Sequence, residues 1–287
     1  MALKNLLVHL DPAEGSQRRL HAATAMASRH GAHLTGLFVK DQSFAQLNRA
    51  KAAELGLSPA REMAAIDRMV DEVIEAGAET TRAQFEKAVH AAGVHAEWRC
   101  ERGRADEIVP RHARYADLCI IGQWKPEMEE LPYLPRLVEQ VLFLSGRPTL
   151  IVPSVAGPTE LGRHVLAGWN ASRGAARAIN DAMPLLAAAD HVTVLVIDPE
   201  QGDHAHGEEP GTDIARHLAL HGVKVTTTSV TSQSSGIGQT ILDHAAKIGA
   251  DMVVTGCYGH SRWREFILGG TTRVLLRQSA IPVMMSY

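Results

Sequence analysis

Two hydrophobic patterns alternate along the chain. Short uninterrupted apolar runs, such as residues 192–197 and 252–255, are typical of strands buried on both faces. Longer stretches, such as the one from Ala175 to Leu186, place apolar residues at helical spacing after Ser172, a good helix-capping residue. Strands that alternate with helices in this way predict a parallel sheet covered by helices on both faces.

The predicted strands form two sets of five. They cover residues 6–10, 34–39, 96–99, 118–121 and 149–152, and then 165–169, 192–197, 223–230, 252–255 and 282–285. Helices are predicted between them at 16–30, 62–92, 105–115 and 136–144, and then at 172–186, 213–221, 238–248 and 271–278. Gly31 is placed to end the first of these helices.

The chain also repeats itself. An Ala-Asp pair, an apolar run and a glycine occur at residues 116–122 and again at 250–256, and a proline before a short strand recurs at the same offset of 134, at Pro148 and Pro282. The first strands match as well, since they end at Asp11 and Asn170. We therefore predict two tandem, doubly wound, five-stranded α/β domains, residues 1–153 and 163–287, joined by a linker.

Composition narrows the class of protein. Hydrophobic residues make up 45% of the 287 residues, charged residues 21%, and the net charge is −3, which is typical of a soluble globular protein without the field that attracts nucleic acid. The 3 cysteines are far apart, and no long apolar run is present. We expect a cytoplasmic protein that binds neither nucleic acid nor membranes.

The strongest chemical signal is a glycine pattern after the strand at 252–255. Gly256, Gly259, Gly269 and Gly270 follow the spacing G-x2-G-x9-G-G, and Thr271 and Thr272 then open a helix. Glycines let backbone N–H groups approach a phosphate closely. The free N–H groups of a helix N-terminus favour negative charge, so the pattern indicates a phosphate-binding site.

This order of elements and this spacing resemble the universal stress protein family, in its tandem two-domain form, over essentially the whole chain. The resemblance implies a Rossmann-like fold of the adenine nucleotide alpha hydrolase type and ATP as ligand, with an aspartate after strand 1 and a valine late in strand 2 at the base and sugar. Val196 matches that valine. Two positions depart from the family pattern: Asn170 replaces the aspartate, and Gly270 stands where Ser or Thr is expected.

The resemblance therefore assigns a nucleotide site to the second repeat. Its candidate residues are Trp169, Asn170, Val196, Thr255, Gly256, Gly259, His260, Gly269, Gly270, Thr271 and Thr272. ATP or another adenine nucleotide is the expected ligand, with Mg²⁺ as a candidate companion of its phosphates.

The first repeat has lost the glycine pattern. Lys125 and Pro135 stand at the positions of Gly259 and Gly269, and prolines and glutamates fill residues 126–135, which would repel a phosphate. Asp11, Val39 and Gly122 keep the other positions, so we predict a vestigial site in a scaffolding repeat. A different ligand beneath the insert at 41–93 is the alternative.

Several functions remain open at this stage. A stress-response or regulatory ATP-binding protein is preferred, and a nucleotide-independent scaffold or a slow ATP hydrolase are the alternatives. No catalytic residue and no metal site is predicted, because the His204 and His206 segment lacks a second cluster and no Walker-type lysine follows the glycines. Cys257 is interpreted as a spacer rather than a redox sensor. The last strands of the two repeats are expected to pair across an internal pseudo-two-fold axis, and dimerisation of the whole chain stays open.

Overall fold

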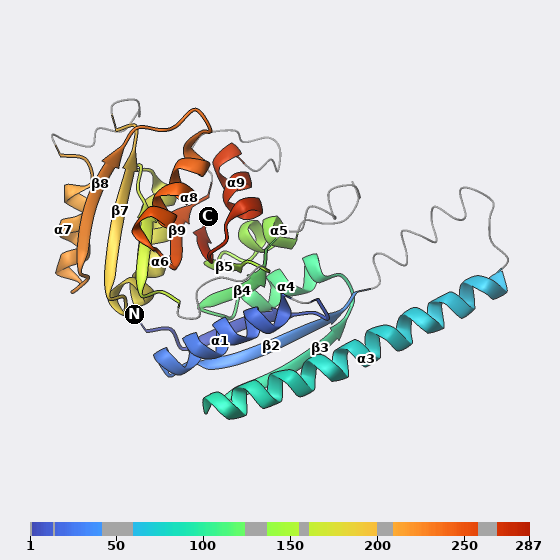
Figure 1. Cartoon of the computed structure of the whole chain (residues 1–287). Coiled ribbons are helices and arrows are strands. Elements are labelled where there is room, and N and C mark those ends of the chain that lie inside the picture. The colour runs from blue at the N-terminus through green and yellow to red at the C-terminus, as the bar shows by residue number, and fades with distance from the viewer. Residues whose placement is uncertain are drawn as a thin grey trace.

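The computed structural model describes residues 2–13, 15–41, 60–123, 137–154, 161–199, 209–257 and 269–287. These residues form one ten-stranded sheet covered by helices on both faces (Figure 1). The α/β class and the two sets of five strands predicted from the sequence are therefore confirmed, and the two sheets are joined edge to edge into one.

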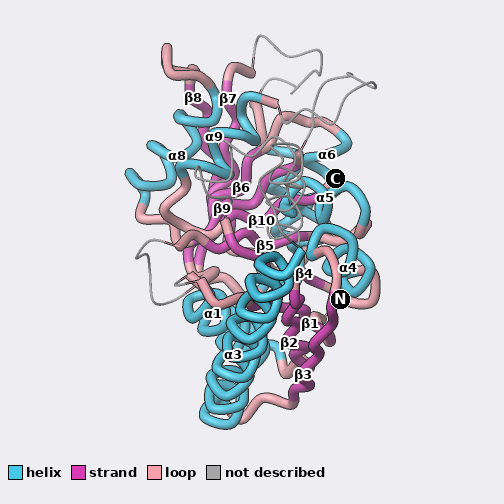
Figure 2. The backbone as a smooth tube through the Cα atoms, turned by 90° about the vertical axis from the view of Figure 1, so that its right-hand side faces the viewer, coloured by secondary structure: helices cyan, strands magenta, loops and turns pink. Residues whose placement is uncertain are grey.

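The first repeat supplies half of this sheet. Its elements are β1 (Asn5–Leu10), α1 (Ser16–His30), β2 (His33–Lys40), α3 (Ala60–Ala92), β3 (Ala96–Arg102), α4 (Ala105–Ala113), β4 (Leu118–Gly122), α5 (Leu137–Leu144) and β5 (Thr149–Val152). The long helix α3 contacts β2, β3 and α1, and Figures 1 and 2 show it running beside the sheet and extending past its end.

The second repeat supplies the other half in the same order. Its elements are β6 (His164–Gly168), α6 (Arg173–Ala187), β7 (His191–Ile197), α7 (Thr212–Leu220), β8 (Val225–Val230), α8 (Ile237–Ile248), β9 (Met252–Gly256), α9 (Gly270–Gln278) and β10 (Val283–Ser286).

The helix boundaries follow from local chemistry. Gly31 ends α1 in the left-handed conformation, with φ of 57°, and the Ser172 hydroxyl caps α6 by accepting a hydrogen bond from the N–H of Ala175 at 3.2 Å. Two predicted boundaries were wrong. Val223 belongs to the turn that closes α7, because its N–H donates to the carbonyl of Leu218, and Tyr115 lies in a turn after α4, where its N–H donates to the carbonyl of His112.

The strand order is β3-β2-β1-β4-β5-β10-β9-β6-β7-β8. Within each repeat all neighbouring strands are parallel, and only β5 and β10 pair antiparallel, with Met284 opposite Leu150. This is the internal pseudo-two-fold pairing expected from the repeat. Because the central pair is antiparallel, the carboxyl ends of the two sets of parallel strands lie at opposite edges of the sheet.

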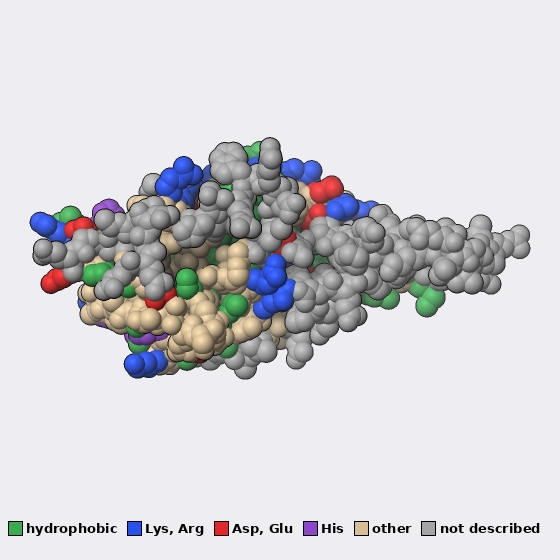
Figure 3. Space-filling model, turned by 90° about the horizontal axis from the view of Figure 1, so that it is seen from above, with side chains coloured by type: hydrophobic (Ala, Val, Ile, Leu, Met, Phe, Trp, Pro, Cys, Tyr) green, Lys and Arg blue, Asp and Glu red, His purple; other side chains and the backbone are tan. Residues whose placement is uncertain are grey.

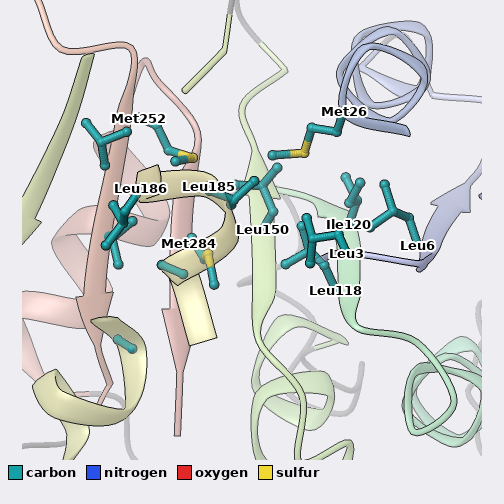
Figure 4. Close-up of a cluster of buried hydrophobic side chains, with 14 of the residues drawn as sticks. Leu3, Leu6, Met26, Leu118, Ile120, Leu150, Leu185, Leu186, Met252 and Met284 are labelled. Carbon is teal, nitrogen blue, oxygen red and sulfur yellow. The ribbon is translucent and has the colours of Figure 1, made fainter. Parts of the chain in front are cut away.

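Each face of the sheet has its own core. One apolar cluster lies under α1, α3, α6 and α7, and the other lies under α4, α5, α8 and α9. Both clusters include residues from the two repeats. Leu150, Leu185 and Met284 are among the buried side chains of the first cluster that Figure 4 labels near the central strand pair. The two repeats therefore share their cores across the β5–β10 junction.

The repeated Ala-Asp pair has a structural role. Asp251 accepts hydrogen bonds from the N–H groups of Gly162 at 2.9 Å, Arg163 at 2.8 Å and His164 at 3.2 Å, and so holds the start of β6. Asp117 does the same for β1 by accepting from Lys4 at 2.7 Å and Asn5 at 3.0 Å. A buried carboxylate thus satisfies the free N–H groups that precede the first strand of each repeat.

Candidate functional site

The second repeat forms a crevice where its strand order reverses, between β6 and β9. Ligands of doubly wound sheets bind at such a point, outside the carboxyl ends of the strands. Helix α6 follows β6 on one face of the sheet and α9 follows β9 on the other, so both helices begin at this edge. The crevice therefore lies between two helix N-termini, which favour negative charge.

The start of α9 offers unpaired backbone donors. The first hydrogen bond inside the helix runs from the N–H of Arg273 to the carbonyl of Gly269 at 3.0 Å, so the N–H groups of Gly270, Thr271 and Thr272 precede it. No side chain caps this end and no acidic residue lies in the first turn. Because a Cβ atom added at Gly269 or Gly270 would meet nothing within 4 Å, the approach to these donors is open among the described residues.

Gly256 has a packing role at the end of β9. A Cβ atom at this position would lie 2.4 Å from the carbonyl carbon of Gly174 and 2.7 Å from the nitrogen of Ala175. The first turn of α6 therefore touches the end of β9 directly, and only glycine allows this approach. Sequence analysis placed Gly256 at the phosphates, and the structure shows in addition that it sets the distance between α6 and the sheet.

Asn170 closes a tight turn between β6 and α6. Its side-chain oxygen Oδ1 accepts hydrogen bonds from the Ser172 hydroxyl at 2.7 Å and from the Ser172 N–H at 3.2 Å. The neighbouring Trp169 is partly buried against the core, and its N–H donates to the carbonyl of Leu195 at 2.9 Å. Asn170 itself is exposed at the crevice.

Three other predicted residues are less accessible than their predicted role suggests. The side chain of Val196 is 0% exposed and that of Thr272 is 5% exposed, so at these positions the main chain is the part that a ligand can reach. The Thr255 hydroxyl donates to the carbonyl of Gly256 at 3.1 Å. The structure thus shifts the emphasis from side-chain hydroxyls to backbone N–H groups.

Part of the predicted site lies outside the described residues. This holds for Gly259 and His260, for the rest of the segment 258–268, and for the histidines of the segment 200–208. Their predicted roles stay predictions. Within the ranges that the structure covers, no group of three His, Cys, Asp or Glu side chains is arranged to hold a metal ion.

The equivalent crevice of the first repeat is filled by Arg19 from α1. The Arg19 side chain is only 6% exposed, and its guanidinium forms an ion pair with Asp11, with Nη2 and Oδ2 2.6 Å apart, and donates from Nε to the carbonyl of His9 at 3.0 Å. Its Nη1 atom lies 2.2 Å from where a Cβ atom of Gly122 would stand. Val39 is also buried, at 7% exposed. Asp11 and Gly122 therefore face an arginine of their own chain.

Sequence analysis missed Arg19 and its neighbour His9. His9 occupies the position that Gly168 has in the second repeat, and burial lowers its pKa to about 4 although Asp11 and Asp41 pull the pKa upward. The same alignment sets Arg19 opposite Ala175. A comparison of the two repeats at these positions would have indicated that the first crevice carries charged groups of its own.

A second pair of residues was also missed, Asp41 and Asp198. Each follows the second strand of its repeat, and each accepts a hydrogen bond from a backbone N–H after the third strand, of Ala105 at 2.8 Å and of Ser232 at 2.8 Å. Hydrogen bonding by Ser232 lowers the pKa of Asp198. These carboxylates fix the loops around both crevices, and their equal spacing from Val39 and Val196 was the available signal.

The cysteines and the surface add little chemistry. Burial raises the pKa of Cys257 to about 12 and that of Cys119 to about 12, so both thiols stay protonated, as expected for a spacer. Figure 3 shows positive and negative side chains interspersed over the face seen from above, and the coloured atoms form no continuous patch of one sign. Within the described ranges, no helix is long and apolar enough to cross a membrane.

Comparison with known proteins supports the fold and the family. The profile of the Universal stress protein family matches residues 162–286. A universal stress protein from Archaeoglobus fulgidus DSM 4304 has a TM-score of 0.73 at 18% identity, covering 98% of this chain and 95% of that one. A functionally unknown protein from Pseudomonas aeruginosa PAO1 has a TM-score of 0.58 at 15% identity, covering 99% and 92%.

Two further findings complete the comparison. A universal stress protein solved in complex with cAMP matches 54% of this chain and 100% of its own length, with 16% identity and a TM-score of 0.37. A search of curated protein sequences found no match.

The fold and the strand-end crevice define an α/β protein built for ligands at the switch point of a parallel sheet. The chain belongs to the universal stress protein family and is of the tandem type, with the family profile on its second repeat and the family fold in both.

Proposed function

We propose that the second repeat binds an adenine nucleotide, ATP in the first place, and that the protein acts in stress response as a nucleotide-dependent regulator. The observation that supports this is the open N-terminus of α9, where the N–H groups of Gly270, Thr271 and Thr272 are free to receive phosphate oxygens. Membership of the family and the position of this helix end at the switch point support the same site.

The main chain does most of the binding in this proposal. Gly270 to Thr272 receive the phosphates, the ends of β6 and β7 at Asn170 and Val196 receive the sugar and base, and Gly259 and His260 complete the phosphate loop. Mg²⁺, where present, is held chiefly by the phosphates themselves and by water. Binding then shifts a conformational or assembly equilibrium toward the form that holds the nucleotide better.

The first repeat serves as a scaffold in this proposal. Arg19 and Asp11 neutralise each other inside the crevice where a ligand of the first repeat would lie, and the guanidinium fills the space beside Gly122. An ordered ion pair at this point favours a structural role over a second nucleotide site.

A substitution of Gly270 tests the phosphate site with a matched control. Gly270 is the first residue of α9, where proline is tolerated, and Gly269 before it has φ of −58° and ψ of 154°, a conformation that suits a residue before proline. Gly270→Pro removes one N–H donor and keeps the helix, whereas Gly270→Ala keeps the donor. We expect calorimetric titration with ATP, with and without Mg²⁺, to show binding by the wild type and by Gly270→Ala, and an affinity about tenfold or more lower for Gly270→Pro.

Circular dichroism and thermal melting of the free proteins check that the three variants fold alike. Equal ATP affinity of Gly270→Pro and Gly270→Ala would remove α9 from the site. A wild-type protein that gives no heat and no thermal shift with ATP would contradict the nucleotide proposal itself.

A further inference from the structure

The side chain of Asn170 has a fixed orientation. Its atom near Ser172 receives a backbone N–H at 3.2 Å, and because an N–H only donates, that atom is the oxygen. The Ser172 hydroxyl also donates to this oxygen, at 2.7 Å. The Nδ2 amide group is therefore the free end of the side chain, and it has no partner in the part of the chain that the structure describes.

The first repeat shows what an aspartate does in the same turn. Asp11 uses Oδ1 to accept from the N–H of Ala13 at 2.9 Å, the residue two positions later, as Asn170 does with Ser172. The second oxygen of Asp11 is then left over, and it takes the cation of Arg19 at 2.6 Å. The second repeat has a hydrogen-bond donor where the first has a negatively charged acceptor.

The surroundings of Asn170 reinforce this reversal. The first turn of α6 starts beside it and contains no acidic residue, so the positive end of the helix dipole is uncompensated there. Ala175 replaces Arg19, so no cation of α6 is placed to pair with a carboxylate. The amide donor and the helix end together favour an acceptor or an anion at the end of β6.

We propose that Asn170 selects adenine nucleotides that carry a phosphate on the ribose, at the 3′ position, in addition to the 5′-phosphate. This inference rests on the proposed nucleotide site. A nucleotide with its 5′-phosphate at the start of α9 turns its sugar toward the end of β6, where Asn170 donates to an added phosphate. An aspartate at this position would repel that phosphate.

Two isomeric ligands test the proposal. ADP and adenosine 3′,5′-bisphosphate have the same atoms and number of phosphates and differ in where the second phosphate is attached. We expect calorimetric titration to show that the wild type binds the bisphosphate at least as tightly as ADP. Asn170→Asp, which can form the turn that Asp11 forms, should weaken the bisphosphate by about tenfold or more and change ADP by less than about threefold, because like charges near a protein surface repel over this range. The loss should shrink as salt is raised.

Asn180→Asp is the matched control. Asn180 is exposed on α6, so this variant adds the same charge to the same helix away from the crevice, and it should bind both ligands as the wild type does. A wild type that binds ADP but prefers it to the bisphosphate by more than tenfold, or an Asn170→Asp variant that loses both ligands equally, would overturn the selectivity and leave the nucleotide site standing. Failure of both ligands to bind the wild type overturns the selectivity and the nucleotide site together.

Discussion

Single residues at equivalent positions of the two repeats have taken different chemical roles. Asp11 and Asn170 form the same turn, but one carries a charge that pairs with Arg19 and the other ends in an amide donor. His9 and Gly168 occupy the same position in the first strands, and only the first adds an ionisable group. The side chains beside the strand ends, rather than the backbone, distinguish the two crevices.

His9 gives this difference a pH signature. Its pKa is lowered from 6.5 to about 4 by burial, so between these values the unfolded chain binds a proton that the folded chain does not. The free energy of unfolding should therefore fall as the pH drops from about 6.5 to 4, by up to about 3 kcal/mol from this one group. His9→Gln should remove that part of the pH dependence in urea unfolding experiments.

His90→Gln, exposed in the last turn of α3, controls for the loss of a histidine. Identical pH slopes for the wild type and His9→Gln across this range would contradict the buried, neutral state of His9.

At the scale of elements, glycines set how closely helices approach the strand ends. A Cβ atom at Gly256 would collide with the backbone of α6, 2.4 Å from the carbonyl carbon of Gly174, whereas a Cβ atom at Gly122 would meet the end of the Arg19 side chain at 2.2 Å. A backbone clash requires the whole helix to move, and a side-chain clash is relieved by rotation. The two positions therefore differ in what a methyl group costs.

Alanine substitutions compare the two contacts. Gly256→Ala should lower the free energy of unfolding by about 2–3 kcal/mol, in the range of overpacked cores, and it should also displace α6 from the crevice and weaken nucleotide binding. Gly122→Ala should cost about 1 kcal/mol or less, since the guanidinium can shift while it keeps Asp11 as its partner. Denaturant midpoints measure both, and a larger loss for Gly122→Ala would contradict this account.

At the scale of the molecule, the β5–β10 pair makes the two repeats one folding unit. Met284 of β10 is 1% exposed, lies opposite Leu150 of β5, and belongs to a core cluster that includes residues of both repeats. Unfolding of one repeat would expose the apolar surface of the other at this junction. We therefore expect the wild type to unfold in one cooperative transition, with equal calorimetric and van't Hoff enthalpies.

A charge at the junction should break this unity. Met284→Lys buries an unpaired ammonium group between the repeats and should cost more than about 3 kcal/mol, and calorimetry should then show separate transitions or self-association through the freed strand edges. Leu220→Lys, on α7 and 82% exposed in the wild type, should leave the transition unchanged. A single, unshifted transition for Met284→Lys would show that the junction does not couple the repeats.

The fold could be predicted from the sequence because each element carries its own signal. The apolar runs, the Gly31 stop and the Ser172 cap are local, and the 134-residue repeat fixes the order of the elements. The boundaries at Val223 and Tyr115 were wrong because turn hydrogen bonds to Leu218 and His112 override the propensity of the segment.

The site was less predictable than the fold. Positions such as Gly270 follow from a motif, but the orientation of Asn170 depends on a hydrogen bond from Ser172 that spacing alone does not reveal. Arg19 was missed because its partners, Asp11 and the space beside Gly122, lie 8 positions before it and more than 100 positions after it in the chain. Such contacts become visible only when the strands are laid side by side.

Fusion of the two repeats into one polypeptide has a consequence for how they can diverge. In a homodimer built on the same strand pair, one gene writes both halves, so an arginine that closes one crevice closes the other too. Here the antiparallel junction is formed within a single chain, and each half mutates alone. One partner is thus free to become a permanent companion while the other keeps its chemistry, in a ratio of one to one that no change in concentration can disturb.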